Sequence, residues 1–271
     1  MTASMSPLAA ELGRIAHDAG RLILKHYAQA SEVRTKADSS PVTIADEEAE
    51  ALILARLAKL EPRVPVIAEE SVAKGHVPAL ASRFFLVDPL DGTKEFLQRN
   101  GEFTVNIALI ENGRPTAGVV IAPAKARAFI GDIEGGAFEL AAPEDLPLEI
   151  EAAQRIAARA APSAGLVAVV SRTHRDTKTD HYLSSYHVTN LVAAGSSLKF
   201  CLVATGEADL YPRHGTTMEW DTAAGQAVLE AAGGSVTTLE GDALTYGKAD
   251  RGFVNPHFVA RGKPSPSFGR S

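Results

Sequence analysis

The chain has 271 residues and a mass of 28.5 kDa, and its 27 Lys and Arg against 33 Asp and Glu give a formal charge of −6. Hydrophobic residues at 45% and charged residues at 22% are globular proportions, which exclude disordered and fibrous classes. The mild acidity argues against a nucleic-acid coat protein, and a single cysteine, Cys201, excludes a disulfide framework. No apolar run approaches the roughly 18 residues of a membrane span, and we expect no secretory signal, because residues 1–20 lack a charged segment followed by an apolar one.

Hydrophobic periodicity predicts two helices in the first 60 residues. Residues 7–29 form the first, with one apolar face made of Leu8, Leu12, Ile15, Ala19, Leu22 and His26. Residues 43–60 form the second, with a stripe made of Ala49, Leu52, Ile53, Leu57 and Leu60. The polar segment 35–41 between them is predicted as a loop. Two apolar runs of strand length, 64–68 and 84–87, then lead directly into carboxylates.

The middle of the chain has the pattern of antiparallel strands. Strands 104–110 and 117–122 flank Asn112-Gly113, a pair that readily supplies the positive φ angles of a tight hairpin. A second hairpin is predicted over 126–140. The Ala- and Pro-rich segment 141–165 is predicted to join an N-terminal subdomain, 1–145, to a C-terminal one, 146–271.

Strands and helices alternate from residue 166 on, which favours a partly parallel sheet in the second half. The strands are predicted at 166–170, 188–192 and 208–211, and the helices near Thr179, at 196–205 and at 221–232. Cys201 lies on the apolar stripe of the second of these helices, so we expect it to be buried.

The segment from Leu86 to Thr93 carries the densest chemistry. A strand delivers Asp88 at its end, and Gly92 allows a sharp turn that brings Asp91 back beside it. Adjacent carboxylates repel each other unless a cation lies between them, and Mg²⁺ together with the Leu90 carbonyl would satisfy both. The alternative is a polar turn in which the two Asp side chains cap local N–H groups. These residues alone leave both interpretations open.

Three further carboxylates lie at the ends of predicted elements. Glu69 follows strand 64–68, Asp221 opens a helix, and Asp46 lies three residues after Thr43. The structural alternatives are a helix N-cap for Asp221 and a capping-box partner for Asp46. Carboxylates at the ends of elements converge where open sheets bind ligands, so we expect these residues near Asp88.

Asp88-Pro89-Leu90-Asp91-Gly92-Thr93 and Trp220-Asp221-Thr222-Ala223-Ala224-Gly225 resemble the two signatures of the inositol monophosphatase superfamily, and Ala68-Glu69-Glu70-Ser71 resembles its third acidic element. Segments 36–43, 91–96, 100–110, 195–201 and 210–213 are similar to the CysQ-type 3'(2'),5'-bisphosphate nucleotidase branch. The resemblance covers about residues 10–260. It implies an α/β (mixed α and β) class and a layered αβαβα sugar-phosphatase-like fold. An antiparallel sheet would form the N-terminal part, a smaller mixed or parallel sheet the C-terminal part, and the site would lie between them.

The resemblance also implies a metal centre of two or three Mg²⁺ ions. The implied ligands are Glu69, Asp88, the Leu90 carbonyl, Asp91 and Asp221. Such ions would clamp a phosphoryl group and acidify a bound water. Asp46 or Glu69, together with Thr93, would then be the catalytic groups that orient this water for in-line attack on phosphorus, with no phosphoenzyme intermediate. Inhibition by Li⁺ is a further implication.

The implied substrate-binding residues are Glu69, Leu90, Asp91, Gly92, Thr93, His174, Ser196, Lys199, Arg213 and Asp221. The cationic trio of His174, Lys199 and Arg213 would suit a substrate with a second phosphate, because Lys and Arg bind phosphate through charge-assisted hydrogen bonds. The structural alternatives are a solvated cation for Lys199 and a surface residue for His174.

The implied function is Mg²⁺-dependent hydrolysis of the 3'-phosphate of 3'-phosphoadenosine 5'-phosphate to AMP, linked to sulfate assimilation, with 3'-phosphoadenylyl sulfate as a further substrate. An inositol monophosphatase or fructose-1,6-bisphosphatase stays open as an alternative, and so does a non-catalytic nucleotide- or metal-binding regulator. We expect a small-molecule nucleotide bisphosphate as partner, no nucleic-acid polymer, and a monomer or homodimer. We expect a cytoplasmic protein, with peripheral attachment to the inner membrane left open.

Overall fold

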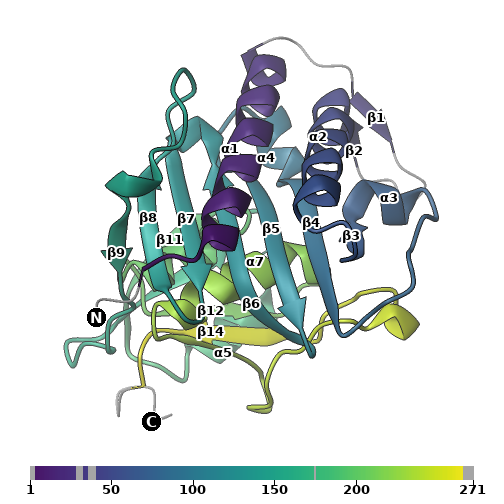
Figure 1. The fold of residues 1–271 in the computed structure, drawn as a ribbon. Coiled ribbons are helices and arrows are strands. Elements are labelled where there is room, and N and C mark those ends of the chain that lie inside the picture. Colours follow the sequence, from purple (N-terminus) through teal and green to yellow (C-terminus); the bar gives the residue numbers. More distant parts are fainter. Residues whose placement is uncertain (1–3, 29–32, 36–40, 174, 265–271) are drawn as a thin grey trace.

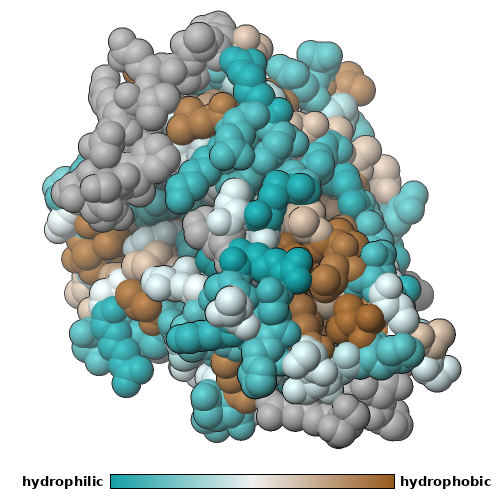
Figure 2. Space-filling model, turned by 180° about the vertical axis from the view of Figure 1, so that it is seen from behind, coloured by the Kyte–Doolittle hydropathy of each residue, from teal (hydrophilic) through white to brown (hydrophobic). Residues whose placement is uncertain are grey.

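The computed structural model describes residues 4–28, 33–35, 41–173 and 175–264. Two main β-sheets and three layers of helices alternate in the order helix, sheet, helix, sheet, helix (Figure 1). The predicted αβαβα layering is therefore confirmed. In the part of the chain that is described, no helix is long and apolar enough to cross a bilayer. Seen from behind, the surface is largely hydrophilic around a few hydrophobic patches (Figure 2).

Helices α1 (Pro7–Ala28) and α2 (Ile44–Leu60) form the first layer and cover one face of the larger sheet (Figure 1). Both helices were predicted, but the buried stripe of α1 differs from the expected one. Leu8, Leu22 and His26 are partly exposed, and Ala16 and Ile23 are buried instead, because the sheet contacts the face centred on Leu12, Ile15 and Ala19. On α2, Leu52 and Leu60 are likewise only partly buried.

A short antiparallel pair, β1 (Val33–Thr35) and β2 (Pro41–Thr43), lies between these two helices in the sequence. Thr35 and Pro41, the two ends of the predicted loop 35–41, therefore lie in strands. The remainder of that loop, 36–40, lies outside the described residues, as does Gln29 at the predicted end of the first helix.

The larger sheet has seven strands that follow each other in chain order. They are β3 (Val66–Ala68), β4 (Arg83–Asp91), β5 (Thr104–Glu111), β6 (Arg114–Ala122), β7 (Arg127–Asp132), β8 (Gly136–Ala141) and β9 (Gln154–Ile156). β3 pairs parallel with β4, and the other neighbouring pairs are antiparallel. Both hairpins were predicted, and Asn112 and Gly113 have φ angles of 51° and 78°. β9 lies beyond residue 145 and still belongs to this sheet, and the division into two subdomains stays a prediction.

The smaller sheet is mixed, as expected, and has the strand order β11-β10-β12-β14-β13. Its strands are β10 (Leu166–Ser171), β11 (Val188–Ala194), β12 (Leu210–Arg213), β13 (Ser235–Thr238) and β14 (Phe258–Arg261). β10 pairs parallel with β11 and β12, whereas β14 pairs antiparallel with β12 and β13. Helix α5 (Thr177–Leu183) packs on its outer face. The sequence analysis missed β13 and β14, which are only four residues long.

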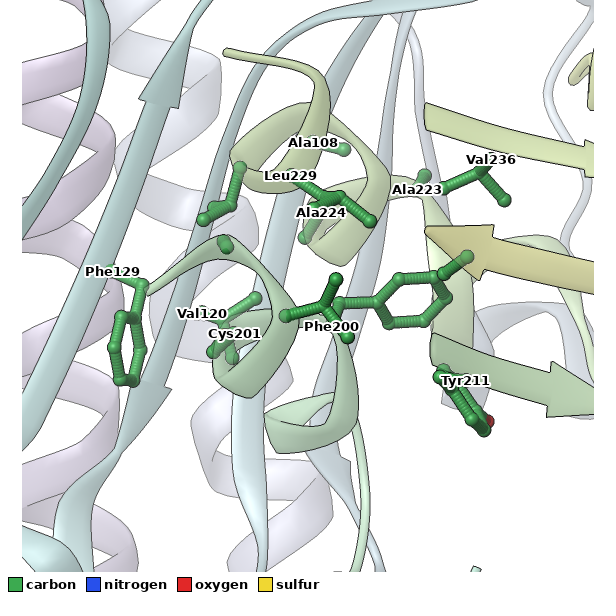
Figure 3. Packing of buried hydrophobic residues seen from close by; sticks show 14 of the residues in the cluster. Ala108, Val120, Phe129, Phe200, Cys201, Tyr211, Ala223, Ala224, Leu229 and Val236 are labelled. Atoms are coloured by element: carbon green, nitrogen blue, oxygen red, sulfur yellow. The ribbon is translucent and has the colours of Figure 1, made fainter. Parts of the chain in front are cut away.

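Helices α6 (Leu198–Ala204) and α7 (Glu219–Ala231) form the middle layer between the two sheets. Figure 3 shows Phe200 and Cys201 of α6 beside side chains from α7 and both sheets. Glycines in the larger sheet let α7 approach it closely. A β-carbon on Gly131 would lie 2.5 Å from the Val228 Cα, and one on Gly118 would lie 2.6 Å from the Ala227 Cβ. This packing fixes the position of α7, whose N-terminal end carries Asp221.

Short elements complete the fold and bring further residues toward this end of α7. Helix α3 (Glu69–Ala73) follows β3, and helix α4 (Thr93–Leu97) follows β4. Three 3₁₀ segments are Pro123–Lys125, Ile150–Ala152 and Ala249–Arg251.

Candidate active site

A pocket of about 280 Å³ lies where β4, α6, β12 and α7 meet, between the two sheets. Among the described residues, every predicted site residue except Asp46 lines it. These residues are Glu69, Asp88, Leu90, Asp91, Gly92, Thr93, Ser196, Lys199, Arg213 and Asp221. His174, which was also predicted, lies outside the described residues. The fold thus brings together carboxylates and cations from both halves of the chain.

The turn from β4 into α4 carries the first two carboxylates. The pairing of β4 with β5 is interrupted between Asp88 and Asp91, which turns this end of the strand out of the regular ladder. Asp88 is buried, and its Oδ1 accepts a hydrogen bond from the Leu90 N–H over 3.0 Å. Gly92 has φ +89°, and a β-carbon there would collide with the Ser196 hydroxyl. Glycine is therefore required at this turn both by its backbone angle and by space.

Asp91 is held by two polar residues that the sequence analysis gave no role. Ser197 Oγ lies 3.1 Å from Asp91 Oδ2 and 2.7 Å from the Asp221 carbonyl oxygen. Asn106 Nδ2 donates to Ser197 Oγ over 3.0 Å and lies 3.4 Å from Asp91 Oδ2. Asn106 is a buried polar residue in the otherwise apolar run 105–110, which is the one signal that could have drawn attention to it.

Burial and mutual repulsion dominate the electrostatics of the carboxylates. Burial raises the pKa of Asp91, although the nearby Lys199 ammonium opposes this. Burial also raises the pKa of Asp221 well above its usual value, and the charges of Asp91 and Glu69 raise it further. Carboxylates in this condition gain stability when a cation lies between them.

The donor set fits a hard divalent cation. Carboxylate oxygens and a backbone carbonyl are the ligands that Mg²⁺ prefers. Within the described ranges, no group of three or more His, Cys, Asp or Glu side chains is arranged closely enough to hold an ion. The ligand assignment and the number of ions therefore stay predictions.

Asp46 adjoins the pocket through Thr93. Its Oδ2 accepts the backbone N–H of Thr43 over 2.8 Å and the Thr43 hydroxyl over 2.6 Å, so the capping-box alternative is realised. Its Oδ1 lies 3.4 Å from Thr93 Oγ1, which can donate to it. The two functions do not compete, because each uses a different oxygen.

Glu69 is the first residue of α3 and lies at the pocket wall. The first turn of this helix is anchored by Glu50 of α2, whose carboxylate accepts the Glu70 N–H over 2.8 Å and the Ser71 hydroxyl over 2.7 Å. Glu50 was not singled out from the sequence, where it is one of several acidic residues in a helix.

The two predicted cations in the described part of the chain are buried in the pocket wall. Burial lowers the pKa of Lys199 to about 8, although Asp91 opposes the effect. Its ammonium donates to the Ser196 carbonyl and lies 5.4 Å from the centre of the Tyr211 ring. The solvated-cation alternative for Lys199 is therefore wrong. Arg213 donates through Nε to the Gly215 carbonyl and through Nη2 to the Thr216 carbonyl, both over 3.2 Å.

Known proteins are similar to this chain in both fold and sequence. The model of the inositol monophosphatase family matches residues 4–263. The chain therefore belongs to the inositol monophosphatase family, whose members are phosphatases that typically depend on Mg²⁺.

Curated relatives extend the match to almost the whole chain. The 3'(2'),5'-bisphosphate nucleotidase CysQ of Escherichia coli (strain K12) is 44% identical over 247 residues, which cover 90% of this chain and 96% of that protein. The protein of the same name from Buchnera aphidicola is 40% identical over 250 residues, 91% of each chain. The CysQ-type resemblance predicted from the motifs is confirmed.

Solved structures agree with these relatives. The structure of CysQ from Bacteroides thetaiotaomicron, a bacterial member of the inositol monophosphatase family, superposes with a TM-score of 0.80 at 38% identity. The match covers 95% of this chain and 98% of that one. An IMPase from Thermotoga maritima superposes with a TM-score of 0.74 at 24% identity, which shows a common fold.

Proposed function

We propose that this chain is a Mg²⁺-dependent 3'(2'),5'-bisphosphate nucleotidase, which hydrolyses the 3'-phosphate of 3'-phosphoadenosine 5'-phosphate to AMP and phosphate. One observation carries the proposal: Lys199 and Arg213 are buried in the wall of the same pocket that is lined by the four predicted metal-binding carboxylates. The activity in the names of the curated relatives, which are 40–44% identical over nine tenths of the chain, supports the same substrate.

The carboxylate side of the pocket is assigned to the metal and the reacting phosphate. Glu69, Asp88, the Leu90 carbonyl, Asp91 and Asp221 would hold two or three Mg²⁺ ions, which supply charge neutralisation on the phosphoryl group and a more acidic water. Thr93 lines the pocket and is hydrogen-bonded to Asp46. Its hydroxyl oxygen has lone pairs that can accept a hydrogen bond from the attacking water, and Asp46 or Glu69 can take up the proton.

The cationic side of the pocket is assigned to the second phosphate of the substrate. Arg213 has five N–H donors, and its Nε and Nη2 are engaged with backbone carbonyls. Its other N–H groups, together with the Lys199 ammonium, can form charge-assisted hydrogen bonds to phosphate oxygens. A substrate with a single phosphate would not use both sides of the pocket. Action on 3'-phosphoadenylyl sulfate, a place in sulfate assimilation and a cytoplasmic location belong to the same proposal.

The test is an analysis of products. The purified protein is incubated with 3'-phosphoadenosine 5'-phosphate in the presence of Mg²⁺ or of EDTA, and the nucleotides are separated by chromatography. The proposal predicts AMP and phosphate in equal amounts with Mg²⁺ and none with EDTA. Release of the 5'-phosphate, or no release by the metal-loaded protein, would contradict it. The Asp91→Asn variant, which we expect to be inactive, controls for contaminating phosphatases.

A further inference from the structure

Glu102 lies in the loop between α4 and β5 and connects this loop to the smaller sheet. Its carboxylate accepts two hydrogen bonds from Arg172, Nε to Oε2 over 2.7 Å and Nη2 to Oε1 over 2.9 Å. Oε2 also accepts the backbone N–H of Gly195 over 2.9 Å. Although partial burial raises the pKa of this carboxyl, the bonds from Arg172 and Gly195 outweigh it, and the pKa of Glu102 lies below its usual value. The pair is therefore ionic at neutral pH.

Arg172 extends this connection to two neighbouring strands. It directly follows β10, and its Nη2 also donates to the Ala193 carbonyl in β11 over 2.7 Å. Its backbone N–H donates to the Ala194 carbonyl over 3.2 Å. Through one arginine, Glu102 thus holds the carboxyl ends of two parallel strands of the smaller sheet.

The turn that follows β11 depends on the same loop. Ser196 has φ +49°, a conformation that costs a non-glycine residue about 1 kcal/mol or more, so it persists only where the surroundings support it. Its Oγ lies 2.7 Å from the Glu102 carbonyl oxygen and 2.8 Å from that of Asp91. The turn also sits directly on the loop, because a β-carbon on Gly195 would lie 2.7 Å from the Glu102 carbonyl oxygen.

Ser197 at the end of this turn and Lys199 just after it lie next to the carboxylates of the pocket. Ser197 Oγ is 3.1 Å from Asp91 Oδ2, and Lys199 follows within the first turn of α6. Displacement of the turn would therefore move two groups at the same time: the Ser197 hydroxyl beside Asp91 and the Lys199 ammonium, whose charge acts on Asp91.

We propose that Glu102 is a positioning residue, which fixes the 195–197 turn and thereby sets the orientation of Asp91 and the place of Lys199 in the pocket. The catalytic part of this inference rests on the proposed function. Glu102 does not line the pocket and acts through Ser196 and Ser197.

The chain offers a closely matched control for this arrangement. Asp209 accepts Arg159 Nε over 2.7 Å and Nη2 over 2.9 Å, and it accepts the backbone N–H of Val167 over 2.8 Å. Glu102 receives bonds of the same three kinds, and both carboxylates are bonded to the smaller sheet through a backbone N–H, of Val167 in β10 for Asp209 and of Gly195 after β11 for Glu102. Neither Asp209 nor Arg159 lines the pocket.

The experiment compares Glu102→Gln with Asp209→Asn. Both amides keep one acceptor oxygen but present N–H groups to the arginine fork, so each loses its ion pair. Two quantities are measured for each variant: the hydrogen exchange of the backbone amides of residues 195–198, and kcat and KM with 3'-phosphoadenosine 5'-phosphate at several Mg²⁺ concentrations.

We expect faster exchange at 195–198 and a roughly 10- to 100-fold loss of kcat/KM in Glu102→Gln, which is the usual effect of removing a group that orients a metal ligand. Asp209→Asn should lower the thermal stability and leave both quantities at the wild-type values. Arg172→Lys, which keeps the charge but loses the fork, should lie between wild type and Glu102→Gln.

Unchanged exchange at 195–198 in Glu102→Gln, or an equal loss of kcat/KM in Asp209→Asn, would overturn the proposal. The exchange measurement does not depend on the substrate. If the wild-type protein fails to hydrolyse 3'-phosphoadenosine 5'-phosphate, the proposed function fails, and the same comparison with p-nitrophenyl phosphate still tests the role of Glu102.

Discussion

Thr93 and Asp46 are joined by a hydrogen bond, with Thr93 Oγ1 3.4 Å from Asp46 Oδ1. They are the first residue of α4 and the third residue of α2, 47 positions apart in the chain. The second oxygen of Asp46 closes the capping box of α2 with Thr43. One carboxylate thus fixes the start of an outer helix and reaches the wall of the pocket. The hydroxyl of Thr93 is the group through which it can act on a water molecule.

The Thr93→Val variant tests this arrangement. Valine has the shape of threonine but no hydroxyl, so we expect KM to stay near the wild-type value while kcat falls roughly 10²- to 10⁴-fold, the range that positioned proton transfer contributes. Thr93→Ser keeps the hydroxyl and should retain most of the activity. A Thr93→Val enzyme with the kcat of the wild type would show that the hydroxyl does not orient the water.

Asp221→Asn should separate stability from activity. The pKa of Asp221 is raised well above its usual value by burial and by the charges of Asp91 and Glu69, so ionisation is less favourable in the folded protein than in the unfolded chain. The carboxyl therefore contributes less and less stability as the pH rises past its unfolded-state pKa. In EDTA at neutral pH, we expect Asp221→Asn to be at least as stable as wild type. It should be inactive, and Mg²⁺ should raise its Tm less than that of wild type.

Asp132→Asn is the control with the opposite sign. Although partial burial raises the pKa of Asp132, the hydrogen bonds from Ser6, Glu134 and Gly135 outweigh it and hold the pKa below its usual value. Its ionised form thus stabilises the folded protein at neutral pH, and the amide should lower Tm. A lower Tm in EDTA for Asp221→Asn as well would show that repulsion is not the dominant effect at Asp221.

Lys199→Ala should change selectivity between substrates. Loss of a charge-assisted hydrogen bond costs roughly 1.5–3 kcal/mol, so binding of 3'-phosphoadenosine 5'-phosphate should weaken by at least about tenfold. Hydrolysis of a simple phosphomonoester should weaken far less. Lys248→Ala is the control outside the pocket, since Lys248 also donates to the carbonyl three residues before it and lies 5.2 Å from a tyrosine ring, whereas its charge is paired with Glu219 over 2.7 Å. An equal loss for both classes of substrate in Lys199→Ala would remove its assignment to the second phosphate.

The burial of His17 predicts a pH dependence of the free energy of unfolding that does not involve the pocket. This histidine of α1 is 3% exposed, and its Nε2 lies 2.9 Å from the Pro143 carbonyl oxygen. Burial lowers its pKa below the ordinary value of 6.5. Its contribution to stability is therefore complete above pH 6.5 and is lost as the pH falls through the lower pKa of the folded state. His17→Gln keeps an N–H donor but does not titrate, so its free energy of unfolding should fall less between neutral and mildly acidic pH. Equal falls for the two proteins would contradict this.

Local signals explain which parts of the fold could be predicted. Helices α1 and α2 have apolar residues at helical spacing, and the β5–β6 hairpin has Asn112-Gly113 at its turn. Strands β13 and β14 have no such signal. Each has four residues, and β13 reads Ser-Val-Thr-Thr, so these strands are defined by pairing with each other and with β12 rather than by their own pattern.

The same distinction holds within the site. Asp88, Asp91 and Asp221 lie at the ends of elements in motifs of recognisable spacing, so they could be singled out from the sequence. Ser197 could not be, because what makes it important is a contact with Asp91, 106 residues away. Glu102 could not be singled out either, because its proposed role depends on a contact with Arg172, 70 residues further along the chain.

The most direct test of the central claim is a comparison of kcat/KM for 3'-phosphoadenosine 5'-phosphate, inositol 1-phosphate and fructose 1,6-bisphosphate, each with and without Mg²⁺. We predict that the nucleotide is preferred by more than about tenfold, equivalent to roughly 1.4 kcal/mol of transition-state stabilisation, and that activity requires Mg²⁺. A preference for either sugar phosphate would contradict the assignment of Lys199 and Arg213 to the second phosphate of a nucleotide.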